Sequence, residues 1–385
     1  MDSSEKKVIY AIIGAGIFFR LSLLSLSPIA SDDLNRYLWD GRVMTNGINP
    51  YRYAPNDPAL NFLHTSSLPQ SVNFPAMKSI YPPFAQLVFF CANKLFGESY
   101  TGFKLLLFLF EISTIILLIY LLKEIKKPLY YVSLYALCPL PIMQFMVDGH
   151  VDSIGIPLLV LSLLMFFKRK RLGFYITSGL SISTKLVSAM ILPFTIDDLE
   201  KSYLRKVFFA IIPLAVFALS YLPFVTNGVF PFESLGTFTT NWAFNGSAFS
   251  LFFSFIPNNQ KARLLCAVLF LLFGMYLFFS KKETSQKIYL IFFAFFILSP
   301  TVHPWYICWL AAILPICFNW SGMAFVCLIN LANFVVINYK LKGIWQMDSS
   351  VLWIEYLPVV GLFIWEMLKN KRPNSLNQYQ TASRL

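Results

Sequence analysis

Long apolar stretches, separated by short charged segments, recur along almost all of the 385 residues of this chain. Most of them approach the roughly 20 apolar residues that an α-helix needs to cross the hydrocarbon core of a bilayer. Hydrophobic residues make up 57% of the chain and charged residues only 13%, and the mean hydropathy is +0.62. A soluble domain of this composition could not cover its surface with polar groups. The pattern predicts an all-α integral membrane protein.

The basic residues lie in short clusters between the apolar stretches. A formal net charge of +12 is compatible with nucleic-acid binding, but clusters of this kind more often fix the orientation of membrane helices. The clusters are Lys6-Lys7, Lys123 with Lys126-Lys127, Lys168 to Arg171, Lys281-Lys282 with Lys287, and Lys369 with Lys371-Arg372. We therefore expect membrane lipids as partners and no nucleic acid.

A consistent path through the membrane results when every basic cluster is placed in the cytoplasm. About twelve crossing helices are then expected, over 8–28, 102–122, 128–146, 153–167, 172–184, 186–199, 207–225, 262–279, 287–301, 304–318, 321–339 and 351–368. Both termini would be cytoplasmic, and 29–101 and 226–261 would form two large outer loops. The conspicuous carboxylates and all three histidines would lie on the outer side, so we expect any chemistry there.

Two segments need a decision in this path. The stretch 82–97 is short for a crossing and contains Lys94, and as a crossing it would move the next basic cluster to the outside. We expect it to lie along the outer surface as an interfacial helix. The stretch 172–199 is long enough for one helix, but a single crossing would leave a basic cluster outside. A re-entering pair of short helices, with Lys185 at the outer turn, fits better.

A single membrane domain is expected over 1–372, followed by a polar cytoplasmic tail over 373–385 that is expected to be disordered. The six cysteines are scattered through apolar stretches without CxxC spacing, which favours core packing over a disulfide framework or a zinc site. No repeat of the kind found in many transporters is visible.

The strongest candidate for chemistry is the polar segment 31–42, directly after the first apolar stretch. Asp32 and Asp33 are adjacent, and Arg36 and Arg42 follow closely. A carboxylate beside cations can act as a general base next to a bound anionic group. The alternative is that Asp32 or Asp33 caps a helix within a solvated charge cluster.

Further candidates lie in the other outer segments. Tyr81 precedes two prolines that can start a helix, and His150 and Asp152 lie in a short turn where they could bind a metal ion or a sugar, or cap the next helix. Lys185 is an ionisable residue in an apolar stretch, which is costly unless it has a function or reaches the interface. The remaining candidates are His303, Trp305 and Tyr306, which also suit an interfacial aromatic belt, and Asn241 and Asn245 in the second outer loop.

In their order along the chain, the segments 32–53, 81–86, 149–153, 184–185 and 299–306 resemble the GT-C-fold glycosyltransferases that use polyprenyl-phosphate sugars. The resemblance is to polyprenol-phosphate-mannose-type mannosyltransferases and relatives of the GPI mannosyltransferase. It covers most of the chain, and only the five motifs together are specific. In that superfamily an Asp-Glu or Asp-x-Asp pair stands shortly before Arg-Tyr. Here Asp33 matches best, but Leu34 replaces the glutamate and Asp32 precedes, so either could be the base.

The resemblance implies a GT-C-type bundle and an enzyme that moves a hexose, with mannose expected, from a polyprenyl-phosphate donor to a glycan, lipid or protein acceptor outside a bacterial or archaeal cytoplasmic membrane. Inversion at the sugar would use an aspartate base, and no obligatory metal or other cofactor is expected. Donor phosphate binding is expected from Lys185, His303 and Arg36. Substrate contacts are expected from Arg42, Tyr81, His150, Asp152, Asn241, Asn245, Trp305 and Tyr306.

Two other functions are compatible with the sequence. A secondary transporter or flippase of lipid-linked sugars would need ionisable residues deep in the membrane, and Arg20 and Glu111 are such residues. A polysaccharide polymerase or ligase that uses diphosphate-linked oligosaccharides would be expected to carry arginine-rich outer loops, which this chain lacks. The chain also has no Rossmann-type glycine signature for a nucleotide sugar.

Overall fold

The structure of the chain is a computed structural model that describes residues 3–225 and 228–369. Within these residues every regular element is an α-helix or a 3₁₀-helix, and the only β pairing is two isolated bridges that join Phe244 and Asn245 to Thr301. The all-α class predicted from the sequence is confirmed. The tail expected over 373–385 lies outside the described residues.

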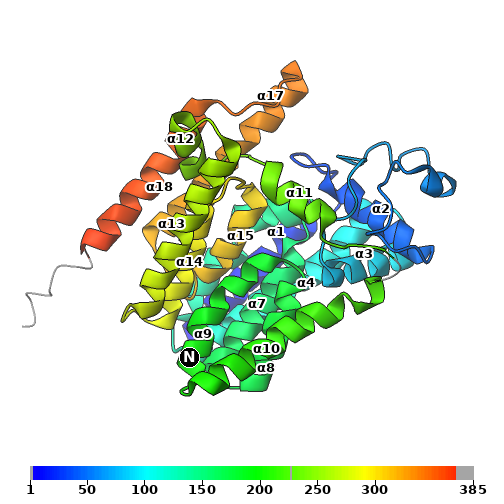
Figure 1. Cartoon of the computed structure of the whole chain (residues 1–385). Coiled ribbons are helices and arrows are strands. Elements are labelled where there is room, and N and C mark those ends of the chain that lie inside the picture. Colours follow the sequence, from blue (N-terminus) through cyan, green and yellow to red (C-terminus); the bar gives the residue numbers. More distant parts are fainter. Residues whose placement is uncertain (1–2, 226–227, 370–385) are drawn as a thin grey trace, which may run out of the picture.

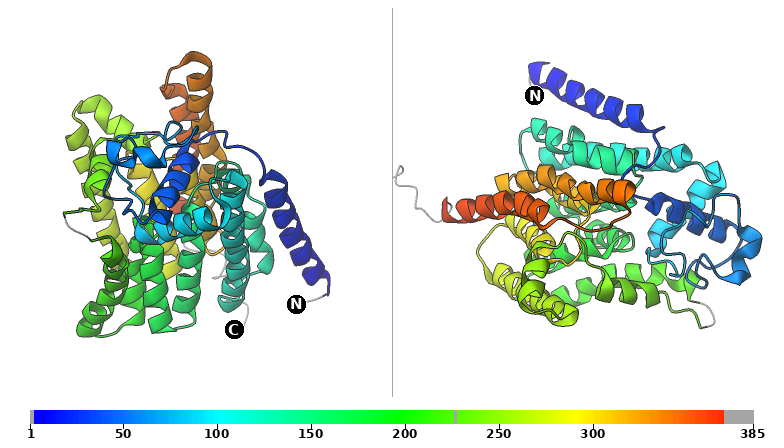
Figure 2. Two further views of the ribbon diagram at one scale, coloured as in Figure 1. Left: turned by 90° about the vertical axis from the view of Figure 1, so that its right-hand side faces the viewer. Right: turned by 90° about the horizontal axis from the view of Figure 1, so that it is seen from above.

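Helices occur close to the stretches where hydropathy predicts them. The main bundle consists of α1 (Ser3–Leu23), α4 (Tyr100–Glu124), α5 (Ser133–Ala136), α6 (Pro139–Met146), α7 (Asp152–Phe167), α8 (Arg171–Ile182), α9 (Leu192–Leu199), α10 (Tyr203–Ser220), α13 (Asn259–Phe279), α14 (Thr284–Leu298), α15 (Pro304–Ile313), α16 (Trp320–Leu328), α17 (Phe334–Lys342) and α18 (Ser349–Lys369). These helices lie side by side, with α1 at the edge of the molecule (Figure 1, Figure 2).

Five helices among the described residues are long and apolar enough to cross a membrane: Tyr100–Glu124, Tyr203–Phe224, Asn259–Phe279, Trp320–Lys342 and Ser349–Lys369. A sixth candidate is the pair Leu129–Ala136 and Pro139–Met146, which is bent by 47°. The helices α7, α14 and α15 are apolar but shorter. The chain is thus an integral membrane protein, although several of the twelve expected crossings are short or broken helices.

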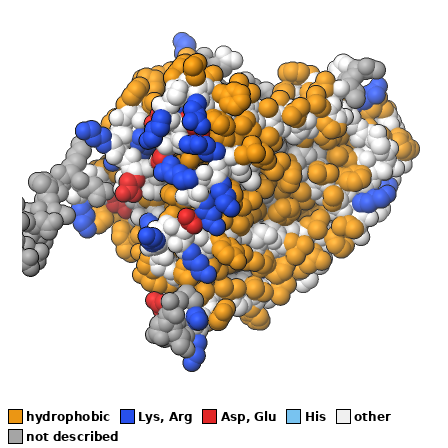
Figure 3. Space-filling view, turned by 90° about the horizontal axis from the view of Figure 1, so that it is seen from below, with side chains coloured by type: hydrophobic (Ala, Val, Ile, Leu, Met, Phe, Trp, Pro, Cys, Tyr) orange, Lys and Arg blue, Asp and Glu red, His pale blue; other side chains and the backbone are white. Residues whose placement is uncertain are grey.

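Three of the basic segments expected in the cytoplasm lie together at one end of the bundle. Arg169 donates to the carboxylate of Asp198 at 2.6 Å, and Thr284 donates to the other oxygen of Asp198, also at 2.6 Å. Residues from four segments line a cavity of about 310 Å³ at this end. It is lined by Glu124, Ile125, Lys127, Phe167, Glu283, Ser285 and Ile316. Figure 3 shows lysine and arginine side chains gathered over part of the lower face, beside a large apolar surface.

The two expected outer loops carry short helices of their own. The first contains α2 (Asp33–Thr45), the 3₁₀-helix η1 (Pro58–Leu63) and α3 (Pro83–Phe96), and the second contains α11 (Glu233–Asn241) and α12 (Ser247–Phe255). In Figure 1, α2 and α3 lie at one side of the bundle, and α11 and α12 lie at its upper end.

Helix α3 is docked on α2. It begins at Pro83, where the missing N–H of proline costs no helical hydrogen bond, and it ends at Gly97, whose φ is +61°. At 14 residues it is about 21 Å long, which is too short for an unaided crossing. Gly41 of α2 lies so close that an added Cβ would be 2.4 Å from the carbonyl oxygen of Phe89. The short helix expected at 82–97 therefore exists, and its angle to the membrane stays a prediction.

The stretch expected as a re-entering pair is broken at Lys185. Helix α8 ends at Ile182, and the 3₁₀-helix η3 (Leu186–Ile191) leads into α9. The backbone N–H of Phe84 donates to the carbonyl of Ser183 at 3.1 Å. The N-terminus of α3 is thereby fixed against the break, and the first outer loop and Lys185 come to the same end of the bundle.

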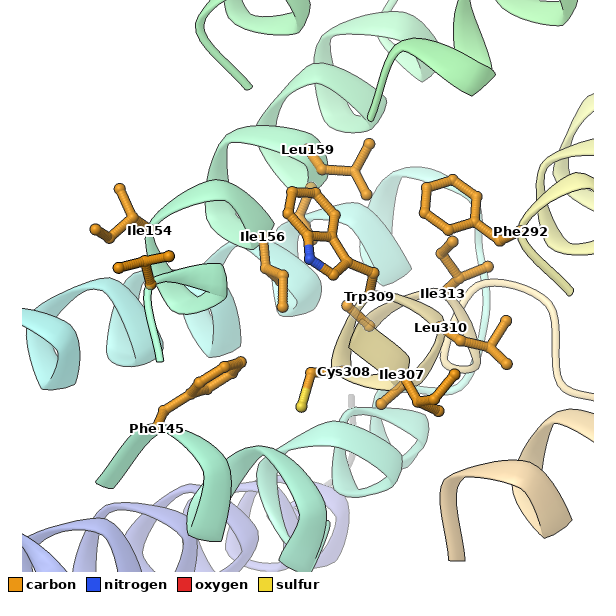
Figure 4. Packing of buried hydrophobic residues seen from close by; sticks show 14 of the residues in the cluster. Phe145, Ile154, Ile156, Leu159, Phe292, Ile307, Cys308, Trp309, Leu310 and Ile313 are labelled. Carbon is orange, nitrogen blue, oxygen red and sulfur yellow. The ribbon is translucent and has the colours of Figure 1, made fainter. Parts of the chain in front are cut away.

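The core of the bundle surrounds Trp309 of α15. Figure 4 shows its indole between Ile156 and Leu159 of α7 and Phe292 of α14, with Phe145 of α6 on the far side of the cluster. All five side chains are at most 1% exposed. Burial of side chains this large stabilises the packing of α6, α7, α14 and α15, on whose ends the polar residues of the next section stand.

Arg20 and Glu111 form a closed polar cluster inside the bundle. The two side chains are 0% exposed and make an ion pair of 2.9 Å between α1 and α4. The guanidinium also donates to the carbonyls of Gly16 and Ala136, and the Tyr135 hydroxyl donates to Glu111 at 2.6 Å. Each charge is compensated within the protein. The two residues that kept a transporter in consideration therefore join helices to one another.

Candidate active site

Asp33 stands in the first turn of α2 and faces the turn between α6 and α7. Its side chain is 20% exposed, whereas Asp32, at the N-cap position, is an exposed residue and makes no side-chain capping hydrogen bond. The capping interpretation of Asp32 is therefore wrong in this structure. Burial raises the pKa of Asp33 to about 6, although a hydrogen bond from Asn73 opposes this shift. A carboxylate with this pKa is suited to take up a proton near neutral pH.

The two oxygens of Asp33 have different surroundings. Oδ1 accepts a hydrogen bond of 2.7 Å from the side-chain amide of Asn73. Oδ2 lies 3.4 Å from the hydroxyl of Tyr37 and 3.6 Å from Nδ1 of His150. The first contact is a firm hydrogen bond, and the two contacts to Oδ2 are long. Oδ2 is thus the oxygen that remains available to a reacting hydroxyl group.

His150 faces Asp33 from the turn between α6 and α7. The preceding Gly149 has a φ of +74° and lies against Leu34, so the turn and α2 pack directly on each other. The imidazole is 0% exposed, and within the described residues neither of its nitrogens has a hydrogen-bond partner. Burial and the nearby Lys185 hold the pKa of His150 well below its usual range, so the ring is neutral.

A column of stacked rings extends from His150. Its ring lies 3.6 Å from that of Trp305, which lies 4.2 Å from His303, which in turn lies 4.5 Å from Phe244, with interplanar angles of 7–16°. Burial lowers the pKa of His303 to about 3, with a further contribution from Lys185. His303 is therefore neutral and could offer a substrate a hydrogen bond but no charge. The column joins the 147–151 turn to the second outer loop.

Lys185 supplies the cation of the site. Its ammonium group lies 2.5 Å from Asp152 and 3.8 Å above the ring of Tyr306. Asp152 is almost fully buried and also accepts a hydrogen bond of 2.6 Å from the indole of Trp309. Burial lowers the pKa of Lys185, and the Asp152 carboxylate opposes this shift. With 27% of its side chain exposed, Lys185 can still reach an anionic ligand.

The structure gathers seven of the predicted residues around one site and surrounds others with protein. Asp33, His150, Lys185, His303, Trp305 and Tyr306 lie together. Tyr81 joins them, since its ring packs edge-on against Tyr37 at 5.0 Å. Asp152 lies behind Lys185 and is 2% exposed.

Arg36 and Arg42 are committed to contacts within the first outer loop. Arg36 pairs with Asp40 at 2.8 Å and donates to the carbonyl of Met77, although its Nη2 has no partner among the described residues. Arg42 pairs with Glu98 at 2.6 Å. Their expected roles in binding phosphate and substrate stay predictions.

The two asparagines of the second outer loop also have protein partners. Asn241 is exposed and donates to the carbonyl of Thr237 within its own helix, α11. Asn245 is 5% exposed and donates to Glu355 of α18 at 2.9 Å. Substrate binding by either residue stays a prediction.

Two contributors to the site were not among the predicted site residues. Asn73 and Tyr37 contact Asp33, and both stand among ordinary loop and helix residues. Tyr37 carried a weak signal, because it stands four residues after Asp33 and side chains at this spacing meet on a helix. Asn73 carried no signal, because a contact between residues 40 positions apart leaves no local pattern in the sequence. Within residues 3–225 and 228–369 no three His, Cys, Asp or Glu side chains cluster as metal ligands would.

A family model described as alpha-(1->6)-mannopyranosyltransferase, N-terminal domain (MptA_B family), matches residues 9–197, just under half of the chain. Two solved structures of ArnT from Cupriavidus metallidurans are similar in fold. The form bound to undecaprenyl phosphate has a TM-score of 0.50 and 15% identity, covering 94% of this chain and 72% of that chain. The apo form has a TM-score of 0.53 and 14% identity, covering 96% and 73%. No curated protein matches this chain in sequence.

The family match covers the part of the chain that carries Asp33, His150 and Lys185. The structural likeness extends over nearly the whole chain, and at this identity it establishes the fold. The resemblance seen in the five sequence motifs is thereby confirmed. The chain is a membrane-embedded hexosyltransferase of the GT-C fold.

Proposed function

We propose that this hexosyltransferase transfers mannose from a polyprenyl-phosphate donor to an acceptor at the outer face of the membrane, with Asp33 as general base. The observation that carries the proposal is the meeting of Asp33, whose pKa is raised to about 6, with the cation of Lys185 in one partly open site. The mannosyltransferase family match supports the choice of sugar. The polyprenyl phosphate bound to the similar ArnT structure supports the class of donor.

The reaction divides between a base and a cation. Oδ2 of Asp33 takes the proton of the acceptor hydroxyl while the hydroxyl oxygen attacks the anomeric carbon. The bond from that carbon to the donor phosphate oxygen breaks, and polyprenyl phosphate leaves with the electron pair. A single displacement of this kind inverts the configuration at the anomeric carbon. The ammonium group of Lys185 stabilises the negative charge that grows on the leaving phosphate.

Asp33 is favoured over Asp32 as the base. Asp33 is the partly buried one of the two, and it is close to His150 and to Lys185. Asp32 is an exposed residue at the start of α2. We assign Asp32 to the rim of the site.

Phosphate recognition by Lys185 rests on the same geometry. Asp152, itself held by the indole of Trp309, accepts from the lysine, and Tyr306 lies beneath its ammonium group, so little side-chain freedom is left to lose on binding. His303 would contribute a neutral hydrogen bond. Arg36 can contribute only through Nη2, because its other nitrogens serve Asp40 and Met77.

The proposal also includes the orientation in the membrane, the acceptor class, independence of metal ions and the type of membrane. The site lies at the end of the bundle opposite the basic loops, which supports an outer active site, cytoplasmic termini and about twelve crossings if short and broken helices count. The acceptor is a hydroxyl-bearing glycan, lipid or protein. The mechanism assigned to Asp33 and Lys185 requires no metal ion, and residence in a bacterial or archaeal cytoplasmic membrane agrees with the donor class.

A transfer assay with two donors tests the proposal. The purified full chain in lipid nanodiscs is incubated with polyprenyl-phosphate mannose or with a nucleotide-linked mannose, in the presence of an α-mannoside acceptor. We expect release of polyprenyl phosphate, and a product whose new bond has the anomeric configuration opposite to that of the donor. Transfer from the nucleotide sugar alone, or retained configuration, would contradict the donor class or the single displacement respectively.

A further inference from the structure

The side-chain amide of Asn73 lies between two adjacent carboxylates. Its nitrogen donates to Oδ1 of Asp32 at 2.8 Å and to Oδ1 of Asp33 at 2.7 Å. An amide NH₂ group has two hydrogens, and here each is directed to a different aspartate. Hydrogen bonds of this length to a carboxylate are among the stronger ones that a neutral donor makes. Asn73 thus holds both acidic side chains of the site with one group.

The shared hydrogen-bond donor of Asn73 offsets the repulsion between two adjacent carboxylates. Asp32 and Asp33 are neighbours, so their negative charges repel each other and raise the pKa of Asp33. A donor shared between them lowers that repulsion and fixes the torsion of each carboxylate. Because Asn73 occupies Oδ1 of Asp33, it leaves Oδ2 directed toward Tyr37 and His150.

Asn73 is itself held by contacts on both sides. The preceding Val72 is 4% exposed and packs in the core, and the amide of Asn35 donates to the carbonyl of Ser71 at 3.0 Å. The following Phe74 packs edge-on against Trp242 at 4.3 Å, which connects this loop to the second outer loop. The asparagine therefore has a fixed place, which a positioning group needs.

We infer that Asn73 is a positioning residue that aligns the Asp33 carboxylate for proton transfer and fixes the neighbouring Asp32 carboxylate on the side of Asp33 Oδ1. The inference rests on the proposed role of Asp33 as the base. It assigns to a loop residue, 40 positions away in sequence, the task of separating the functions of two adjacent aspartates.

The acid limb of the pH–rate profile tests this inference, because the loss of a merely structural residue would not shift it. Loss of the donor in Asn73→Ala destabilises ionised Asp33, so its pKa rises and the acid limb shifts to higher pH. The expected shift is about one pH unit, which corresponds to the loss of one hydrogen bond to a charged group. Asn73→Asp keeps the shape of the side chain but adds a third negative charge, and its shift should be larger in the same direction.

Two further variants separate positioning from loop anchoring. Asn35→Ala removes the contact to Ser71 that anchors the same loop, without touching a carboxylate, and should leave the acid limb in place. In the double variant Asn73→Ala/Asp32→Asn the neighbouring charge is gone, so the limb should return toward that of the wild type. An unmoved limb in both Asn73 variants, or an equal shift in Asn35→Ala, would overturn the inference. Failure of the base assignment is recognised separately, by near wild-type transfer in Asp33→Asn.

Discussion

Two groups of buried charges in this protein differ in how many of their polar atoms have hydrogen-bond partners. In the Arg20–Glu111 cluster both side chains are 0% exposed, and the carboxylate, guanidinium and Tyr135 hydroxyl all have short partners. Around Asp33 one carboxylate oxygen has only long contacts, and the nearby His150 has two nitrogens without partners among the described residues. A buried polar group without a partner costs roughly 1–3 kcal/mol, so such a region persists only where something other than stability maintains it.

The comparison teaches how charges in an apolar stretch can be assigned. Arg20, Glu111 and Lys185 all appeared in the sequence as ionisable residues in apolar stretches. The structure separates them by their surroundings. A charge whose partners are all in the protein joins helices, and a charge that keeps part of its surface and some of its hydrogen-bonding capacity free can serve a substrate.

The largest effect is expected on the transfer rate, from a change at Asp33. Asp33→Asn keeps the shape of the side chain but removes its basicity, so the transfer rate should fall by about 10²–10⁴-fold. Thermal unfolding of the variant should stay near that of the wild type, because no closed cluster is broken. The matched variant Asp32→Asn should retain most of the activity. If Asp32→Asn were inactive and Asp33→Asn active, the two aspartates would exchange roles.

The Arg20–Glu111 cluster should give the reverse result, a loss of stability without a loss of transfer activity. Arg20→Leu leaves Glu111 buried without its counter-charge, and we expect a loss of about 3–5 kcal/mol in the free energy of unfolding. The protein that remains folded should transfer sugar at a near wild-type rate. Unfolding is followed in detergent by tryptophan fluorescence, with Leu21→Met on the exposed side of the same helix as control. A stable but inactive Arg20→Leu variant would return the cluster to a functional role.

Lys185 should show an intermediate effect that concerns binding. Lys185→Met keeps the length of the side chain but removes the charge, so the affinity for polyprenyl phosphate should fall by about 1.5–3 kcal/mol, the value of one charge-assisted contact. Titration of polyprenyl phosphate into nanodisc-bound protein measures this change. Lys78→Met, which removes a lysine from an exposed ion pair with Glu233, is the matched control. Equal affinities of wild type and Lys185→Met would assign Lys185 to the interface alone.

A smaller effect is expected from pH. The base must be ionised, and the pKa of Asp33 is raised to about 6, so kcat/KM should be level above that value and fall about tenfold for each pH unit below it. Measurements from about pH 4.5 to pH 8 define the limb. His150 and His303 should not add a second limb in this range, because burial keeps both of them neutral. A limb that persists in Asp33→Asn would belong to another group.

The smallest change should follow removal of metal ions. The proposed reaction stabilises the leaving phosphate with Lys185, so treatment with EDTA followed by gel filtration should change the transfer rate by less than about twofold. Added Mg²⁺ or Mn²⁺ should likewise have little effect. A loss of activity that a divalent cation restores would contradict the metal-independent mechanism.

Hydropathy predicted the helices well because each apolar stretch carries its own signal. Helix α4 was expected at 102–122 and spans Tyr100–Glu124, and the break at Lys185 follows from the positions of the flanking basic clusters. The number of full crossings could not be predicted equally well. The bend between α5 and α6, and the shortness of α7 and α15, depend on contacts between helices that hydropathy does not contain.

The chemical types of the site were predictable, and their pairings were not. The aspartates, Lys185 and the histidines were visible as candidates, and Arg36 was expected to bind the donor phosphate just as Lys185 was. Only the fold shows that Arg36 pairs with Asp40 and that Lys185 remains accessible. Asn73 belongs to the same class of unpredictable contacts, since its partners lie 40 and 41 residues away.

The lengths of α7 and α15 set the depth of the reaction. Phe167, at the end of α7, and Ile316, three residues beyond α15, line the same cavity as Lys127. From that level α7, with 16 residues, rises only about 24 Å to Asp152, and α15, with 10 residues, rises about 15 Å toward His303. The hydrocarbon core is about 30 Å thick. On the proposed function, a lipid phosphate that reaches Lys185 would therefore lie deeper than the headgroups around it.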